Sequence, residues 1–315
     1  MLKDSLGTML NQSLFVLMLG LLTSHSALAA DTLALQKVTD DVYAIVGELG
    51  NRTAENLGNN ATFGFIVTRD GVVVIDAGGT YQGAQRLHAI IKRVTNQPVA
   101  LVINTGGQDH RWLGNGYFKA QGAKIIASAR AVQDQQARRQ DQFFVLGNLV
   151  GDKGLAGTEA VYADTTFDKD KQIEIGGTRI EIHHAGPAHT PGDSFVWLPR
   201  QKVMFSGDIV YTERMLGVMA YSNSKSWLAT YEAMAGYKPQ VIVPGHGHPT
   251  TLAKANADTY AYLKFLRQSV AAFMQAGGDI SEISKIDQSQ FQYLKNYDVL
   301  AGRNAQRVFA EMEFE

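Results

Sequence analysis

Short apolar runs that end in glycine, aspartate or histidine recur along the chain and predict strands. Residues 63–67 and 72–75 flank an Asp70-Gly71 turn, a pattern typical of a hairpin. Similar runs stand just before polar loops elsewhere in the chain, at residues 99–103, 180–182, 203–205 and 241–243. Continuous apolar runs bounded by glycine and proline indicate strands of a sheet that is covered on both faces.

Periodic apolar positions between these runs predict helices. The clearest pattern covers residues 252–275, where Thr251 can cap the start and Gly277-Gly278 can end the helix. Further helices are predicted over residues 82–94, 128–140 and 226–234. Residues 148–167, rich in Gly, Ala and Thr, predict a long surface loop of the kind that often forms a lid. The whole pattern predicts an α/β fold with two sheets between helices.

The first thirty residues have the pattern of a secretory signal peptide. Lys3 precedes an apolar run at residues 14–22, and Ala27-Leu28-Ala29 follows as a small-residue cleavage site. The run is shorter than the roughly 20 residues that span a bilayer, although an amphipathic tail or membrane anchor is the alternative. We therefore expect cleavage after Ala29, a periplasmic or secreted location, and a single domain over residues 30–315 without a membrane segment.

Composition narrows the classes of function. The formal net charge is -1, which argues against a nucleic-acid partner, since such proteins carry a strongly basic face. The chain has no cysteine, which excludes disulfides, thiolate metal ligands and a cysteine nucleophile. Ser206 does not stand in a Gly-x-Ser-x-Gly turn, so a serine nucleophile is disfavoured. A small-molecule substrate remains the expected partner, and the pattern sets no oligomeric state.

Histidines and aspartates follow several of the predicted strands. In open α/β sheets, ligands bind outside the carboxyl ends of the strands. Imidazole nitrogen and carboxylate oxygen from separate loops are the donors expected for zinc, or for iron or manganese. Each of these residues alone could simply tie down a loop, but together and in this order they predict one shared site: Asp109, His110, His189, Asp208 and His246.

The other histidines have simpler expected roles. His25 falls in the predicted signal peptide, and His248 reads as a solvated loop residue. For His88, His183 and His184 we expect hydrogen-bonding roles in the core, at the surface or at a strand end.

The ordered motifs of this chain resemble the metallo-β-lactamase superfamily over residues 41–266. They are Asp76-Ala77-Gly78, the loop ending in Asp109-His110, His189-Thr190-Pro191-Gly192, Ser206-Gly207-Asp208 and Pro244-Gly245-His246-Gly247. The resemblance implies an αββα sandwich, in which two mixed sheets lie between outer helices. Residues 55–61 and 104–115 are most similar to exported members associated with quinoprotein relay systems.

The chain departs from the family pattern His-x-His-x-Asp-His. Aligned on Asp109-His110, the first two histidines are replaced by Thr105 and Gly107. Of the family's first metal site, only His189 and the bridging Asp208 remain. The resemblance leaves the second site complete, with Asp109, His110, Asp208 and His246 as ligands. It therefore implies one metal ion, zinc in the first place and iron or manganese as alternatives.

Two hypotheses follow from this pattern. The first is an exported metal-dependent hydrolase of an ester, thioester, lactam or similar carbonyl substrate. In it, Asp109 is a ligand and possible proton acceptor, and Asp76 orients the metal loops. His189 donates a hydrogen bond to the oxyanion or acts as a general acid. The alternative is a non-catalytic binding or accessory protein of a periplasmic oxidation pathway, which the loss of two ligand histidines favours.

Overall fold

The computed structural model describes residues 32–315 of the chain. The predicted signal peptide, residues 1–29, and its cleavage point lie outside the described residues. In the range that is described, no helix combines the length and the apolar composition that crossing a membrane requires. The residues from 32 to 315 contact one another as one compact unit.

The first sheet of the described range has seven strands that lie side by side in sequence order. They are β1 (Leu33–Thr39), β2 (Val42–Gly47), β3 (Thr62–Thr68), β4 (Gly71–Ile75), β5 (Val99–Asn104), β6 (Lys124–Ser128) and β7 (Thr165–Phe167). Neighbours from β1 to β4 are antiparallel, and neighbours from β4 to β7 are parallel. Every residue of β4 is buried, as expected for a strand covered on both faces.

The second sheet of the described range has five strands. In spatial order they are β12 (Val241–Val243), β11 (Val203–Phe205), β10 (Phe195–Leu198), β9 (Thr178–His183) and β8 (Asp170–Ile175). The pair β11 and β12 is parallel, and the other neighbours are antiparallel. The two sheets share one apolar core, in which Ile75 and Ile103 of the first sheet cluster with Ile182 and Phe205 of the second.

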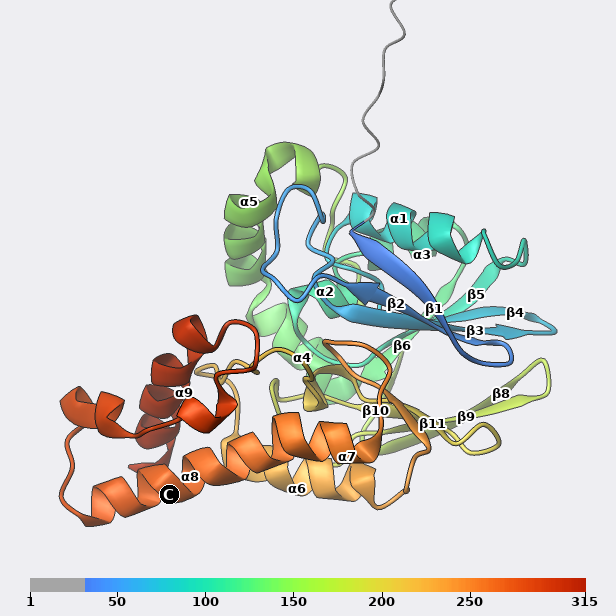
Figure 1. Cartoon of the computed structure of the whole chain (residues 1–315). Coiled ribbons are helices and arrows are strands. Elements are labelled where there is room, and N and C mark those ends of the chain that lie inside the picture. Colours follow the sequence, from blue (N-terminus) through green and yellow to red (C-terminus); the bar gives the residue numbers. More distant parts are fainter. Residues whose placement is uncertain (1–31) are drawn as a thin grey trace, which may run out of the picture. The chain divides into compact units, whose positions relative to one another are not determined.

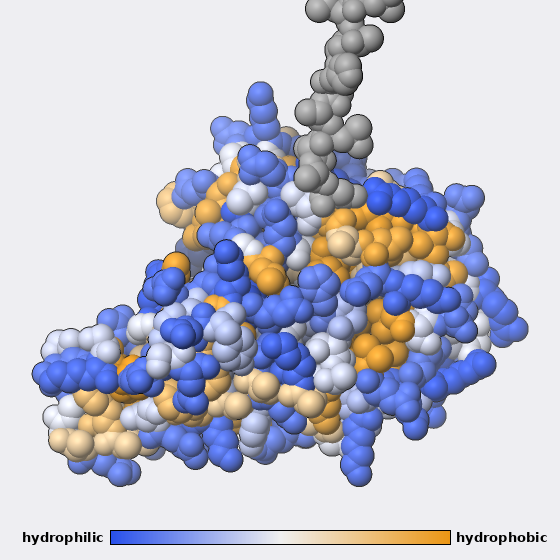
Figure 2. Space-filling view, in the orientation of Figure 1, coloured by the Kyte–Doolittle hydropathy of each residue, from blue (hydrophilic) through white to orange (hydrophobic). Residues whose placement is uncertain are grey.

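Helices cover the outer face of each sheet (Figure 1). On the first sheet, α1 (Tyr81–Ile91) and α3 (Asn115–Ala120) bury apolar side chains against β3 and β4. On the second, α6 (Ser224–Ala235) and α8 (Ala261–Gln275) do the same against β11 and β12. This arrangement confirms the predicted αββα sandwich. Hydrophilic side chains cover most of the face shown in Figure 2, and apolar side chains gather near β1, in a second patch below it and along α8.

The predicted strand positions are confirmed within a residue or two, but the loop predicted over residues 148–167 covers only residues 156–164. Residues Arg139–Leu155 form α5, and β7 begins at Thr165. Leu146 and Val150 stand one helical turn apart and pack on the buried Trp112, which explains why this stretch is helical. Gly151, with φ of 73°, bends the helix near its end.

The helix predicted over residues 252–275 is present but is not regular. It consists of α7 (Leu252–Ala255), a π-helical turn at Asn256–Tyr260, and α8. Thr251 caps its start as predicted, because its side chain accepts a hydrogen bond from the Lys254 N–H. The helix predicted over residues 128–140 ends earlier, as α4 (Ala129–Ala137).

One long helix is absent from the sequence-based prediction. Residues Tyr297–Met312 form α9, which packs on α8 and contributes to the core beneath the second sheet. Its buried positions include Ala301, Ala305 and Val308, which repeat at the spacing of one helix face.

Candidate metal centre

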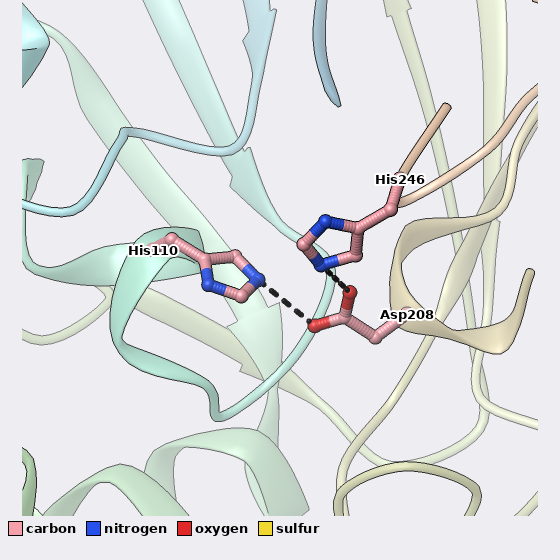
Figure 3. Close-up of side chains that lie close together, drawn as sticks. All are labelled: His110, Asp208 and His246. Carbon is pink, nitrogen blue, oxygen red and sulfur yellow. Dashed lines mark hydrogen bonds and ion pairs between the residues drawn. The ribbon is translucent and has the colours of Figure 1, made fainter. Parts of the chain in front are cut away.

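Three loops at strand ends bring together a histidine, an aspartate and a second histidine (Figure 3). His110 lies in the short helix α2 (Asp109–Trp112) after β5, Asp208 lies in a 3₁₀ turn after β11, and His246 follows β12. Each residue offers one donor atom, and the three atoms all lie within 4.8 Å of one another. Over residues 32–315, this is the one such group of three or more histidines and carboxylates.

Both imidazole rings point at the same carboxylate. His110 Nε2 lies 3.2 Å from Asp208 Oδ2, and His246 Nε2 lies 3.3 Å from Asp208 Oδ1. All three side chains are buried. The geometry therefore places two nitrogen donors around one carboxylate in a site that is largely closed to bulk water.

The hydrogen bond of His246 on its far side determines what its near side can do. His246 Nδ1 has two neighbours: the Asn60 carbonyl oxygen at 3.0 Å, which can only accept, and Arg214 Nη1 at 3.3 Å, which can only donate. The shorter contact with the carbonyl favours a proton on Nδ1. Burial, together with the nearby Arg214, holds the pKa of His246 well below 6.5, so the ring is neutral at pH 7. Its Nε2 lone pair then faces the carboxylate of Asp208.

Asp208 is ionised despite its burial. Burial alone would raise its pKa, but Arg111 and His110 outweigh it and hold the pKa well below 3.8. A lone pair and a carboxylate oxygen only 3.3 Å apart repel each other unless a cation lies between them. Metal-bound histidines commonly donate their other N–H to a backbone carbonyl, as His246 does to Asn60. The donors therefore fit a metal ion.

A fully buried arginine already contacts the central carboxylate. Arg111 Nε and Nη2 donate to the two oxygens of Asp208 at 3.1 and 2.6 Å, and Nη1 donates to Asp76 Oδ2 at 2.9 Å. The remaining bonds go to the carbonyl oxygens of Thr62 and Gly245. Burial opposes the charge of this guanidinium, but Asp208 and Asp76 raise its pKa above 12.5. Arg111 therefore stays protonated and forms ion pairs with both carboxylates.

Asp109, predicted as a fourth ligand, lies beside the group of three and is held by another arginine. Its Oδ1 accepts from Arg52 Nε at 3.0 Å, from Arg52 Nη2 at 2.7 Å and from the His110 backbone N–H at 2.7 Å. Burial opposes ionisation, but Arg52 and His110 lower the pKa of Asp109 well below 3.8. His110 Nδ1 is buried without a hydrogen-bond partner and lies 3.2 Å from the same oxygen.

At the two positions where the family pattern has histidines, Thr105 and Gly107 make contacts within the protein. Thr105 donates to Asp76 through its backbone N–H at 2.7 Å and through its hydroxyl at 2.8 Å. A Cβ at Gly107 would overlap Asp134 Oδ2, because the ion pair of Asp134 with Arg138 packs on this glycine. Asp76 thus orients the loop that carries Thr105, in the place where an orienting residue was expected.

His189 lies in the wall of the same pocket but outside the group of three. Its Nδ1 is 3.0 Å from the Gly217 carbonyl oxygen, and its ring packs against Tyr211 and Trp227. Burial lowers the pKa of His189 to about 4. At neutral pH the ring is therefore uncharged, with its proton on Nδ1, so that Nε2 can accept a hydrogen bond. This arrangement opposes the donor role expected from the sequence.

The remaining described histidines have hydrogen-bond partners away from the centre. The Nδ1 atoms of His88, His183 and His248 contact Tyr117, Asp170 and Glu213, and His184 Nδ1 contacts a backbone carbonyl. Sequence reasoning missed Arg52, Arg111 and the Asn60 carbonyl as parts of the site. Arg111 directly follows the Asp109-His110 motif, so a signal for it was present. Arg52 stands 57 positions from Asp109 and carries no such signal.

A pocket of about 410 Å³ opens beside these residues. His110, His189 and His246 line it together with Tyr211 and Tyr221. Tyr221 donates to Gln108 Oε1 at 2.9 Å, and the guanidinium of Arg138 stacks over its ring at 3.8 Å. Two members of the group of three, His110 and His246, therefore line a space that admits a small molecule.

Known proteins share both the sequence pattern and the fold. A family model described as the metallo-beta-lactamase superfamily matches residues 58–246. The type 2 metallo-beta-lactamase of Elizabethkingia meningoseptica is 26% identical over 241 residues, which cover 73% of this chain and 86% of that protein. The metallo-beta-lactamase IND-1 of Chryseobacterium indologenes is 28% identical over 186 residues, covering 58% of this chain and 70% of that protein.

Among solved structures, a metallo-beta-lactamase from Pontibacter korlensis aligns with a TM-score of 0.60 at 22% identity. The alignment covers 74% of this chain and 99% of that one. At this identity the likeness concerns the fold alone.

Proposed function

Because this chain belongs to the metallo-β-lactamase superfamily, we propose that it is an exported, single-metal hydrolase of an ester, thioester, lactam or similar carbonyl substrate. The observation that carries the proposal is the convergence of His110 and His246 on Asp208, with a neutral Nε2 facing an ionised carboxylate. A cation is the missing partner of such a pair.

Four residues of the site would hold the ion. His110, Asp208 and His246 supply two nitrogens and an oxygen, and Asp109 is the fourth ligand of the family pattern. This set suits zinc, and it also suits iron or manganese. When bound, such an ion lowers the pKa of a coordinated water to near 7 and polarises a carbonyl oxygen.

The chain's own residues prepare this site. Arg111 keeps Asp208 ionised and fixed in orientation, and the Asn60 carbonyl fixes the tautomer of His246. His189, held by the Gly217 carbonyl, presents an uncharged Nε2 that can accept a proton or a hydrogen bond within the pocket. Preorganised groups of this kind cost little reorganisation during a reaction.

Metal content and chelator-sensitive activity test the proposal. We expect about one ion per chain in gently purified protein, and hydrolysis of one member of a panel of nitrocefin, thioesters and aryl esters. A chelator should abolish the activity, and zinc should restore it. His246→Ala should lose the ion, whereas His248→Ala should keep it, because the exposed His248 ring contacts Glu213 away from the group of three. Equal metal content in His246→Ala and the unaltered chain would contradict the assignment.

A second candidate is a non-catalytic binding protein of the same fold that serves a periplasmic oxidation pathway. Two observations favour it: Asp134 fills the space beside Gly107, and Arg111 already contacts both oxygens of Asp208. Folded, metal-free protein that is inactive on the panel before and after zinc addition supports this candidate and excludes the hydrolase.

A further inference from the structure

The pocket has a wall that comes from outside the matched part of the family. The family model ends at residue 246, whereas part of the pocket is lined by residues 296–307. Two backbone hydrogen bonds join this C-terminal segment to the loop after Asp208: Lys295 N–H to the Glu213 carbonyl and Met215 N–H to the Lys295 carbonyl, both at 2.9 Å. Asn296 Nδ2 also donates to the Leu49 carbonyl at 3.2 Å.

A buried asparagine fixes helix α9, drawn in red in Figure 1, against the pocket. Asn304 Oδ1 accepts from the Val218 N–H at 2.8 Å, and its Nδ2 donates to the Leu216 carbonyl at 2.8 Å and to the Tyr262 hydroxyl at 3.0 Å. All the hydrogen-bonding capacity of this side chain except one lone pair is thus used to dock the helix. Arg303 and Arg307, one position before and three after Asn304, then line the pocket.

The pocket wall carries an excess of positive charge. Its lining includes Arg52, Arg214, Arg303 and Arg307 and contains neither aspartate nor glutamate. Arg52 is balanced by Asp109. No carboxylate of residues 32–315 forms an ion pair with the other three arginines, since each ion pair within that range lies elsewhere.

Arg214 is the arginine of this wall that has a buried N–H group without a partner. Its Nη1 donates to the Gly50 carbonyl at 3.1 Å and lies 3.3 Å from His246 Nδ1, but its Nε is buried and has no hydrogen-bond partner. A part-buried guanidinium without a counter-charge is costly, and an anion that enters the pocket would relieve this cost.

Apolar side chains lie next to these arginines. Val218, Met219, Val299 and Leu300 line the same pocket, and the side chains of Met219 and Val299 are 41% and 58% exposed. The wall therefore offers cationic donors and apolar surface side by side, which suits a molecule with an anionic end and an apolar body.

We propose that the arginines of α9, Arg303 and Arg307, together with Arg214, bind the anionic group of an amphiphilic organic acid, whose apolar part rests on Val299 and Leu300. The inference rests on the proposed function only in treating this acid as the substrate; the binding site itself needs no turnover. The guanidinium fork matches the two oxygens of a carboxylate, and charge-assisted bonds of this type are the strong ones.

A matched pair of ligands tests the proposal without any catalysis. The probes are 4-phenylbutyrate and its neutral counterpart 4-phenylbutanamide, titrated calorimetrically into the full chain with its metal bound, at low and at high salt. We expect the acid to bind at least about ten-fold more tightly than the amide at low salt, and this preference should shrink at high salt. In Arg303→Gln/Arg307→Gln the acid should lose about ten-fold or more in affinity, and the amide should be unaffected.

The control variant is Arg130→Gln/Arg200→Gln, which removes the same charge from two exposed arginines outside the pocket. It should bind both probes as the unaltered chain does, and Arg303→Lys/Arg307→Lys should retain part of the preference. If the carboxylate binds only to the metal, the preference for the acid over the amide survives unchanged in Arg303→Gln/Arg307→Gln. An unchanged preference in that variant therefore overturns the proposal. Active protein that binds acid and amide equally refutes this inference alone. Inactive protein with the predicted preference refutes only the hydrolase.

Discussion

Replacing Arg111 by methionine tests the electrostatic centre of the site. The change removes five hydrogen bonds and leaves two carboxylates, Asp76 and Asp208, buried without their shared cation. Asp76 keeps its bonds from the N–H and hydroxyl of Thr105, so the larger loss falls on Asp208.

The expected loss of stability follows from the burial. Breaking a buried ion pair by removing one partner costs about 3–5 kcal/mol, because an uncompensated charge remains. Taking roughly 4 kcal/mol and a urea dependence of about 3 kcal/mol per molar for a chain of this size, the unfolding midpoint should fall by about 1.3 M. Arg111→Met/Asp208→Asn should regain part of this loss, since a neutral amide is less costly to bury than a charge.

Urea unfolding followed by far-ultraviolet circular dichroism, with a chelator present, measures these differences. Arg130→Met serves as the control, because Arg130 is exposed and should change the midpoint little. In a parallel series with zinc in place of the chelator, the midpoint of Arg111→Met should rise by more than that of the unaltered chain, since the ion then supplies the only positive charge bound to Asp208. A free energy of unfolding of Arg111→Met within 1 kcal/mol of the unaltered chain, measured in chelator, would refute this reasoning.

Three further predictions concern single residues. Gly107→His should not restore a second metal ion and should lower stability by about 1–3 kcal/mol, because Asp134 occupies the required space; metal analysis and thermal melting check this. Burial raises the pKa of Asp193 to about 8, so this carboxyl stabilises the fold below pH 4 and loses that contribution as the pH rises to about 8. Asp193→Asn should therefore flatten the pH dependence of unfolding, by at most about 1.4 kcal/mol per pH unit. Asn304→Ala should cost about 1–3 kcal/mol, seen in the melting temperature, since it leaves buried groups unpaired.

Matched variants separate these effects from general damage. Gly302→His, at a helix position open to solvent, should leave the melting temperature nearly unchanged, and Gln306→Ala is the exposed counterpart of Asn304→Ala on the same helix. Asp168→Asn, an exposed change, should keep the original pH dependence. Two ions per chain in Gly107→His, or an Asp193→Asn profile parallel to that of the unaltered chain, would contradict the corresponding argument.

The strands and the positions of the metal-site loops could be predicted from the sequence because both are local signals. Apolar runs that end in glycine mark the strand ends, and the carboxyl ends of β11 and β12 lie side by side because these strands are parallel. Asp208 and His246 are neighbours for this reason, whereas His110 reaches them from the end of β5 in the other sheet. The helix α9 was not predicted although its buried positions keep a helical spacing, since it lies beyond the part of the chain, residues 41–266, that resembles the family.

The partners of the site residues could not be predicted in the same way. Which carboxylate Arg52 approaches depends on how the segment between β2 and β3 folds over α2, a contact between residues far apart in the chain. The hydrogen bonding of His189 could not be predicted for a similar reason. Its hydrogen bond to the Gly217 carbonyl and its low pKa arise from tertiary packing, and neither is encoded near residue 189.

The replacement of the family's two histidines leaves a site whose charge suits one ion. Thr105 and Arg111 both donate hydrogen bonds to Asp76, and Arg111 also donates to Asp208. The protein therefore fixes the Asp208 carboxylate without an ion in the family's first metal site. The carboxyl groups of Asp76, Asp109 and Asp208 face two guanidinium groups, Arg52 and Arg111, so a formal count of these five groups leaves one negative charge. Two divalent ions would reverse this charge to three positive, whereas one leaves a single positive charge beside a pocket that is itself basic. An anionic substrate would complete that balance, and so the loss of two ligands and the gain of a basic wall favour the same chemistry.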